Sequence, residues 1–229
     1  MSRHSPPPRQ LAGGDTQAAA EAAAAADVAI VFLSTTSSEG SDRENLSFPD
    51  DQNKMLEAVA RAQRNTIAVM VNPGAVLTPW SDRVAAALTM FMPGLEMGNA
   101  LSDILYGDVN PSGRLPLTFP NRDNEVNFTQ SQYPGVKVPT GLQSTYSEKL
   151  EVGYRWYDAH GVTPKFAFGH GLSYSSFEYS HLQVSGLTVS FTVKNTGTRA
   201  GNEIPQLYVG YPESAGEPPQ VMFVCCAHA

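Results

Sequence analysis

The sequence predicts an α/β fold with a parallel sheet, followed by a smaller all-β unit. Strand-like apolar runs alternate with amphipathic helical stretches as far as about residue 107, the arrangement of strands joined by crossover helices. From about residue 181 the pattern changes to strict alternation of apolar and polar residues, which is typical of antiparallel strands. With 41% hydrophobic and 16% charged residues, the chain can bury a sizeable core.

The first helix and the first strand follow each other directly. Residues 15–26, "DTQAAAEAAAAA", are rich in alanine and predict a helix, with Asp15 in position to cap its amino end. Residues 27–34, "DVAIVFLS", are a continuous apolar run, typical of a strand buried on both faces of a parallel sheet.

The remaining elements of the α/β region repeat this alternation. The expected elements are a helix at 49–63, a buried strand at 66–74, a third strand within 83–94, a helix at 96–107 and a short edge strand at 113–120. The first of these helices carries an apolar stripe of Met55, Leu56, Val59 and Ala60. Gly107 is expected to end the second helix. Parallel sheets place function at the carboxyl ends of their strands, where "STTSSEG" and "NPG" stand.

Four segments are expected along the chain. Residues 1–14 form a proline-rich disordered lead-in, 15–120 an α/β-sandwich domain, 121–180 a polar connecting segment that wraps around and completes this domain, and 181–229 a partial β-sandwich. Two or three strands cannot close a sandwich, which needs about seven, so the last unit is expected to be truncated.

Composition and motifs exclude several kinds of chemistry. The net charge of −7 argues against nucleic acid or an anionic membrane as partner, and no apolar run approaches the length of a membrane span. The sequence has no phosphate-binding loop and no G-x-S-x-G motif, and its histidines lack metal-ligand spacing. No cofactor and no metal are therefore expected. Carboxylates on loops at strand ends remain as candidates.

Glu39 stands out among these carboxylates, in "SSEGSDR". Its neighbours are small, so a substrate could approach closely, and Gly40 permits a tight turn. Asp42 would raise the pKa of a neighbouring carboxyl and Arg43 would lower it. The residues alone leave two interpretations open: a general acid, or a surface glutamate paired with arginine.

Longer motifs resemble a known family. "MPGLEMGNALSDILYGDVNPSGRLPLTFP", residues 92–120, is similar almost position by position to a block of the family 3 glycoside hydrolases, the β-glucosidase and β-xylosidase group. "EVGYRWYD" and "FAFGHGLSYSSFEYS" resemble later signatures of its C-terminal α/β-sandwich domain, and "VKNTGTRAGNEIPQLYV" resembles the start of its fibronectin type III-like domain.

The resemblance implies a role for the Glu39 loop. "SSEGSDR" matches the family's S-x-E-G-x-D-R loop, so Glu39 is expected to be the general acid/base, with Asp42 and Arg43 as supporting neighbours. The implied reaction is retaining hydrolysis of a β-linked oligosaccharide or aryl glycoside. The family's nucleophile is an aspartate on an N-terminal (β/α)8 barrel of about 250 residues. Because 14 residues precede the first predicted helix, the nucleophile is expected to be absent and a separate barrel domain to be the partner.

Some features keep alternatives open. Tyr154, Trp156 and Tyr157 could stack on a sugar, although aromatic residues at this density more often form core. The ending "VMFVCCAHA" fits none of the family's pattern. A truncation, a frameshift or a misjoined exon would explain this difference. The chain is then either part of a glycosidase or a non-catalytic carbohydrate-binding or interaction remnant of one. A flavodoxin-like nucleotide-binding domain fits the α/β pattern but lacks a phosphate loop. The sequence leaves the localisation unknown.

Overall fold

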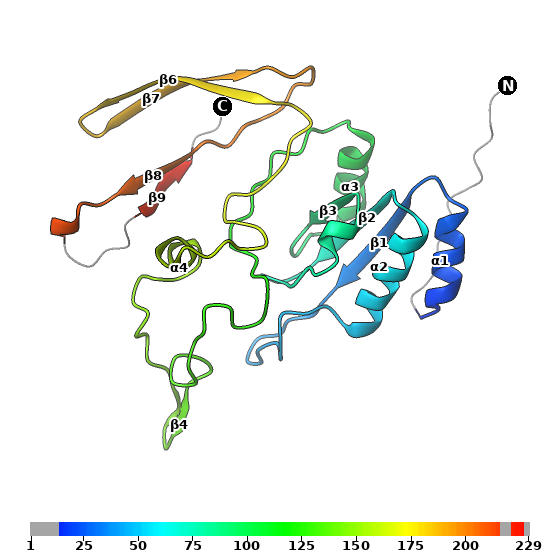
Figure 1. Ribbon diagram of the computed structural model, residues 1–229, viewed down its shortest axis with the longest axis horizontal. Coiled ribbons are helices and arrows are strands. Elements are labelled where there is room, and N and C mark those ends of the chain that lie inside the picture. Colours follow the sequence, from blue (N-terminus) through cyan, green and yellow to red (C-terminus); the bar gives the residue numbers. More distant parts are fainter. Residues whose placement is uncertain (1–13, 216–220, 227–229) are drawn as a thin grey trace. The chain divides into compact units, whose positions relative to one another are not determined.

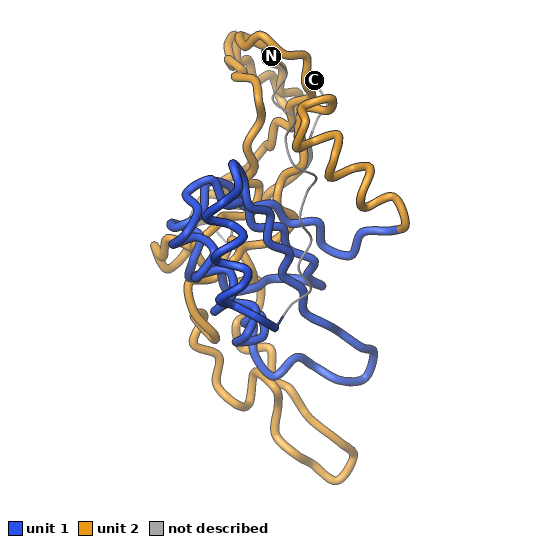
Figure 2. The backbone as a smooth tube through the Cα atoms, turned by 90° about the vertical axis from the view of Figure 1, so that its right-hand side faces the viewer, with its two compact units in different colours: residues 1–94 blue, residues 95–229 orange. Residues whose placement is uncertain are grey.

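The computed structural model describes residues 14–215 and 221–226, so most of the expected lead-in and the last three residues lie outside the described chain. Its backbone divides into two compact units, residues 1–94 and residues 95–229 (Figures 1 and 2). None of the helices within the described ranges combines the length and the apolar character that a membrane crossing requires.

A three-stranded parallel sheet is the centre of unit 1. Its strands are β1 (Ala29–Ser34), β2 (Thr66–Val71) and β3 (Ala86–Thr89), in the order β1-β2-β3. The register pairs the last residue of β1, Ser34, with the last residue of β2, Val71. The segments that follow β1 and β2 therefore start at the same edge of the sheet. This confirms the expected parallel α/β architecture.

Unit 1 also contains two helices. They are α1 (Thr16–Ala24) and α2 (Asp50–Ala62), and a short 3-10 turn, η1 (Ser81–Arg83), precedes β3. The carboxylate of Asp15 accepts a hydrogen bond from the amide of Ala18 at 2.9 Å, which confirms the predicted cap. Within this unit, α1 packs against α2, and α2 packs against β1 and β2 (Figure 1). The side-chain amide of Gln63, just after α2, donates to the carbonyls of Ala23 and Ala26 and joins the two helices.

The core of unit 1 lies between α2 and the sheet. Its fully buried apolar side chains are Leu33, Leu56, Ala68, Val69, Val76 and Trp80. The indole of Trp80 donates to the side-chain oxygen of Asn53 at 3.1 Å, which satisfies the one polar atom that this large side chain buries. The predicted stripe of α2 is confirmed at Leu56, Val59 and Ala60, which are all buried.

The expectation that the first strand is buried on both faces is wrong. Leu33 is fully buried, but Ile30 and Phe32, on the opposite face of β1, are 45% and 53% exposed. β1 is an edge strand, and α1 packs against α2 instead of covering the sheet. A continuous apolar run cannot distinguish this arrangement from a strand covered on both sides.

Unit 2 begins with α3 (Met97–Tyr106), which ends at Gly107 in the left-handed region (φ 80°), as predicted. The edge strand expected at 113–120 is wrong. The segment meets residues 165–170 through separate bonds, among them Leu115 N to His170 O and Phe119 N to Phe166 O, both 2.8 Å. Pro116 and Pro120 have no N–H to donate, so a continuous ladder does not form.

The remaining part of unit 2 contains one short helix and several antiparallel hairpins. The helix is α4 (Tyr154–His160), and the hairpins are β4 (Val136–Val138) with β5 (Gly141–Gln143), β6 (Phe177–Ser185) with β7 (Thr188–Asn195), and β8 (Gln206–Gly210) with β9 (Val221–Cys226). A 3-10 turn, η2 (Glu213–Ala215), follows β8. Among the described residues, no ladder joins β6–β7 to β8–β9. The antiparallel character predicted for this region is confirmed.

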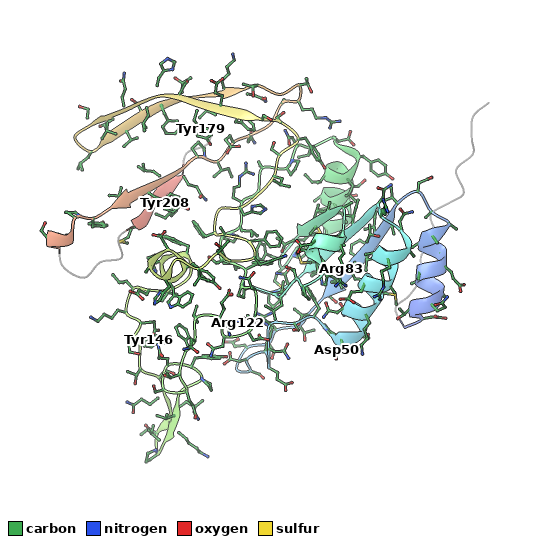
Figure 3. All side chains as sticks on the ribbon, viewed as in Figure 1. Asp50, Arg83, Arg122, Tyr146, Tyr179 and Tyr208 are labelled. Carbon is green, nitrogen blue, oxygen red and sulfur yellow. The ribbon has the colours of Figure 1, made fainter. Side chains whose placement is uncertain are left out.

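Polar contacts connect these hairpins to the rest of unit 2. Arg114 and Glu203 form an ion pair with Nη2 and Oε2 2.8 Å apart, and their side chains are only 11% and 12% exposed. The hydroxyl of Tyr179, on β6, donates to the other carboxylate oxygen of Glu203 at 3.0 Å (Figure 3). Glu203 is therefore a junction between residue 114, β6 and the segment that leads into β8.

Candidate functional site

The loop that follows β1 presents Glu39 at the tip of a tight turn. Ser38 and Ser41 form an isolated antiparallel bridge, which leaves Glu39 and Gly40 as the two residues between them. Gly40 has a φ of +78°, a conformation that a residue with a side chain rarely adopts. Because no atom lies within 4 Å of where a Cβ would stand, Gly40 is needed for this backbone angle and not for space.

The side chain of Glu39 is exposed. Among the residues that the structure describes, it has no hydrogen-bond or ion-pair partner, and no ion pair joins it to Arg43. The pairing with arginine that one interpretation assumed is therefore absent among the described residues, although Glu39 is a surface glutamate. Its neighbours Ser37, Ser38 and Ser41 are small, so both carboxylate oxygens can be approached from outside.

Arg43 anchors the loop instead. Its Nη2 atom donates to the carbonyl of Ala75 at 3.0 Å, just after the "NPG" turn that follows β2. The other terminal nitrogen, Nη1, is buried and has no hydrogen-bond partner within the described part of the chain. A second bond, from Leu77 N to Leu46 O at 2.9 Å, connects the same two segments. The structure thus brings together the two strand-end segments that the sequence singled out.

A polar hollow lies beside the turn. It has a volume of about 610 Å³ and is open to solvent. Its lining is dominated by hydroxyl and carboxylate side chains: Thr35, Thr36, Ser37, Ser38, Ser41, Asp42, Arg43, Glu44, Asn45, Ser47, Phe48, Pro49 and Asp50. Asp50 lies at the start of α2 (Figure 3), where its negative charge interacts favourably with the helix dipole. Such a lining can exchange many hydrogen bonds with a polyhydroxylated molecule.

Of the three aromatic residues that the sequence left open, Tyr157 is a core residue, whereas Tyr154 and Trp156 are half-buried. Tyr157 is 7% exposed and its hydroxyl donates to Glu125 at 2.8 Å. Burial and this bond raise the pKa of Tyr157. The rings of Phe168 and Tyr208 lie against Tyr154, with centroids 5.1 and 5.8 Å away.

The same region contains the second hollow, of about 440 Å³, beside α4. Its aromatic lining consists of Tyr154, Tyr157, Phe168 and Tyr208, residues whose rings mainly contact other protein groups. Across residues 14–215 and 221–226, no group of three or more His, Cys, Asp or Glu side chains is arranged to hold a metal ion. The Glu39 loop is therefore the better candidate site.

Sequence reasoning missed one polar residue at this edge of the sheet. The sequence pointed to Asn72 only as part of the "NPG" strand end and not as a residue of its own. In the structure its side chain is fully buried. Its position after a predicted buried strand was the available signal, since a buried amide must find hydrogen-bond partners.

Comparison with known proteins identifies the family. Residues 10–174 match the model of the glycosyl hydrolase family 3 C-terminal domain. Thermostable beta-glucosidase B of Acetivibrio thermocellus is 44% identical over 194 residues, which cover 80% of this chain and 25% of that protein. DesR, a beta-glucosidase from Streptomyces venezuelae solved in complex with D-glucose, is 40% identical with a TM-score of 0.88, over 93% of this chain and 28% of that one.

A second solved structure agrees. Beta-glucosidase 3B from Thermotoga neapolitana, in complex with glucose, is 31% identical with a TM-score of 0.84, over 94% of this chain and 32% of that one. The chain spans about a quarter of the length of the curated relatives that it matches. In sequence and in fold, the chain belongs to the C-terminal domain family of the family 3 glycosyl hydrolases.

Proposed function

We propose that this chain supplies the general acid/base of a retaining β-glucosidase-type glycoside hydrolase, and that Glu39 is this residue. The observation that supports it most is the placement of an exposed carboxylate, with no hydrogen-bond or ion-pair partner in residues 14–215 and 221–226, on a glycine turn at the carboxyl edge of a parallel sheet. The family membership adds the chemistry, because its relatives carry the name beta-glucosidase.

The reaction needs two carboxyl groups with different roles. In the first step, the protonated carboxyl of Glu39 gives its proton to the glycosidic oxygen, while the bond from that oxygen to the anomeric carbon breaks and a nucleophilic carboxylate bonds to the carbon. In the second step, the Glu39 carboxylate takes a proton from water, whose oxygen attacks the anomeric carbon and releases the nucleophile.

We infer that the nucleophile comes from a (β/α)8 barrel domain, as the family resemblance implies. Retaining enzymes hold their two carboxyl groups about 5 Å apart, so the barrel would have to place its aspartate close to the Glu39 turn. An exposed turn suits this arrangement, since the tip is accessible to a second domain. The polar hollow beside it suits a β-linked oligosaccharide or an aryl glycoside as substrate.

Asp42 and Arg43 have supporting roles in this proposal. Arg43 fixes the loop on Ala75 O. Asp42 lines the hollow, where its carboxylate adds negative charge near the approaching substrate.

The test is reconstitution. The full chain is mixed with a separately expressed barrel domain of a family 3 β-glucosidase, and nitrophenol release from an aryl β-glucoside is measured with each part alone and with both. We expect activity only in the mixture, with a loss of about 100-fold or more for Glu39→Gln. Glu21→Gln is the control, because Glu21 is an exposed glutamate of unit 1 that lies outside the loop and the polar hollow.

Two results would contradict the proposal. Equal activity of the Glu39→Gln and Glu21→Gln mixtures would remove Glu39 from the mechanism. No activity in any mixture, with a barrel known to bind the chain, would favour the alternative, a carbohydrate-binding or interaction module without catalysis.

A further inference from the structure

Asn72, the first residue after β2, buries its side chain completely and uses both ends of it. Its Oδ1 atom accepts from the hydroxyl of Thr89, on β3, at 2.9 Å. Its Nδ2 atom donates to the carbonyl of Gly74 at 2.6 Å. Its backbone amide donates to Phe91 O at 3.1 Å. The side chain therefore connects the end of β3 with the turn at residues 72–75.

This turn contains the carbonyl group to which Arg43 donates a hydrogen bond. Ala75 O accepts from Arg43 Nη2, and Nη1 of the same guanidinium is buried without a hydrogen-bond partner among the residues that the structure describes. Pro73 has no N–H, so its amide cannot help to fix the turn. The bond from Asn72 Nδ2 to Gly74 O does so instead. By holding Gly74, the residue before Ala75, the Asn72 side chain helps to set the position of Ala75 O.

The loop with Glu39 is attached to this segment at two points. One is Arg43 on Ala75 O, and the other is Leu77 N on Leu46 O, at 2.9 Å. Both points lie in the part of the loop that returns toward α2. Apart from the bond between Thr35 N and Val71 O at its start, the tip itself has few bonds to the sheet.

We propose that Asn72 is a positioning residue for the general acid/base. The hydroxyl of Thr89 holds the Asn72 side chain, which in turn holds the 72–75 turn in place. This turn supplies the carbonyl that Arg43 binds, and Arg43 holds the loop from which Glu39 projects. The inference rests on the proposed function of Glu39. It extends that function to a fully buried residue that touches neither Glu39 nor the polar hollow.

Thr89→Val tests this chain of contacts with little change of shape. It removes the hydroxyl that holds Asn72 Oδ1. The matched control is Thr66→Val, because Thr66 also donates a hydroxyl bond, to Gln63 O at 2.7 Å, at the opposite end of the sheet. Each variant loses one hydroxyl hydrogen bond, but Thr66 is fully buried and Thr89 half-buried, so the two are compared after correction for the measured free energy of unfolding of each variant.

The first readout is amide hydrogen exchange in the full chain alone. Under the proposal, Thr89→Val speeds exchange at Leu77, whose bond joins the loop to its support, by about tenfold relative to Thr66→Val. Equal exchange at Leu77 in the two variants would overturn the proposal. Because this measurement needs no barrel and no turnover, it decides the anchoring even where the reconstituted enzyme is inactive.

The second readout is activity in the reconstituted mixture, with an alkyl β-glucoside and a dinitrophenyl β-glucoside. The alkyl leaving group needs protonation by Glu39, whereas dinitrophenolate leaves without it. We expect Thr89→Val to lower kcat for the alkyl substrate about tenfold with KM little changed, and to slow bond cleavage in the dinitrophenyl substrate, followed as the first burst of dinitrophenol before Glu39 acts as base, much less. An equal loss on both substrates would show a merely structural role and would contradict the inference. Asn72→Asp, which keeps the acceptor for Thr89 and loses the donor to Gly74, should reproduce the alkyl-selective loss.

Discussion

The parallel sheet of unit 1 and the β6–β7 hairpin of unit 2 use their apolar residues in opposite ways. Leu33, Leu56 and Val69 are completely buried between helix and sheet, whereas Leu182 and Leu187 on and beside β6 are 69% and 106% exposed. The local alternation of apolar and polar residues is sufficient to predict a hairpin. The apolar side chains of its strands form a core only where a second layer of structure covers them.

The two regions are therefore stabilised by different interactions. Unit 1 depends on apolar burial, while the hairpins of unit 2 are connected through polar groups such as Glu203. Since Glu39 projects from the well-packed region, its placement should survive changes in the hairpins. The following predictions test this difference, from the largest expected effect to the smallest.

Trp80→Ala should lower the free energy of unfolding of unit 1 by about 3–5 kcal/mol, because it removes the largest fully buried side chain and leaves a cavity. Urea-induced unfolding followed by circular dichroism measures the loss. The control is Tyr106→Ala, which removes an 83% exposed aromatic side chain and should cost far less. A loss below about 1 kcal/mol for Trp80→Ala would contradict the description of this core.

Arg114→Met should lower the free energy of unfolding of unit 2 by about 2–3 kcal/mol, because the nearly buried Glu203 would lose its cationic partner and keep the Tyr179 hydroxyl. Arg83→Met is the matched control. Arg83 pairs with Glu57 at 3.5 Å, but the two side chains are 56% and 33% exposed, so its removal should cost at most about 0.5 kcal/mol (Figure 3). Equal losses in the two variants would show that burial of the ion pair is unimportant.

Alkaline pH should weaken unit 2 through Tyr179. Burial and the bond to Glu203 raise the pKa of Tyr179 to about 12 from an ordinary value of 10.0. A raised pKa in the folded state means that this contribution is complete below about pH 10 and is lost as the pH rises toward 12. Tyr179→Phe should flatten the fall in thermal stability over this range. An unchanged slope in the variant would rule out this tyrosine as the cause.

Leu187→Ser should change the free energy of unfolding by less than about 0.5 kcal/mol, because its side chain is fully exposed. It should also reduce self-association of the chain, measured by light scattering, since exposed apolar side chains on open hairpins favour aggregation. Equal light scattering by the variant and the unchanged chain would show that self-association does not depend on this hairpin.

Much of the expected α/β region could be predicted because its signals are local. The cap at Asp15, the buried stripe of α2 and the stop at Gly107 each depend on residues within a few positions. The prediction for β1 was wrong because burial depends on which element covers a face, and an apolar run carries no such information. Pro116 and Pro120 are a related case, since the prolines indicated an edge but the structure has only separate bonds there.

The candidate site was predicted in part. The sequence pointed to Glu39, Asp42 and Arg43 and to the "NPG" strand end as separate segments, and the structure joins Arg43 to Ala75. The polar network behind them could not be predicted, because Asn72 and Thr89 are 17 residues apart and meet only through the register of β2 and β3. The catalytic roles of Glu39, Asp42 and Arg43 stay predictions.

One measurement tests the central claim most directly: the rates at which the reconstituted Glu39→Gln mixture hydrolyses an alkyl β-glucoside and a dinitrophenyl β-glucoside. If Glu39 is the general acid, the alkyl substrate should slow by about 100-fold or more, while bond cleavage in the dinitrophenyl substrate, followed as the first burst of dinitrophenol, should slow far less. Equal slowing of both substrates, or of neither, would contradict the assignment of Glu39 as the acid/base.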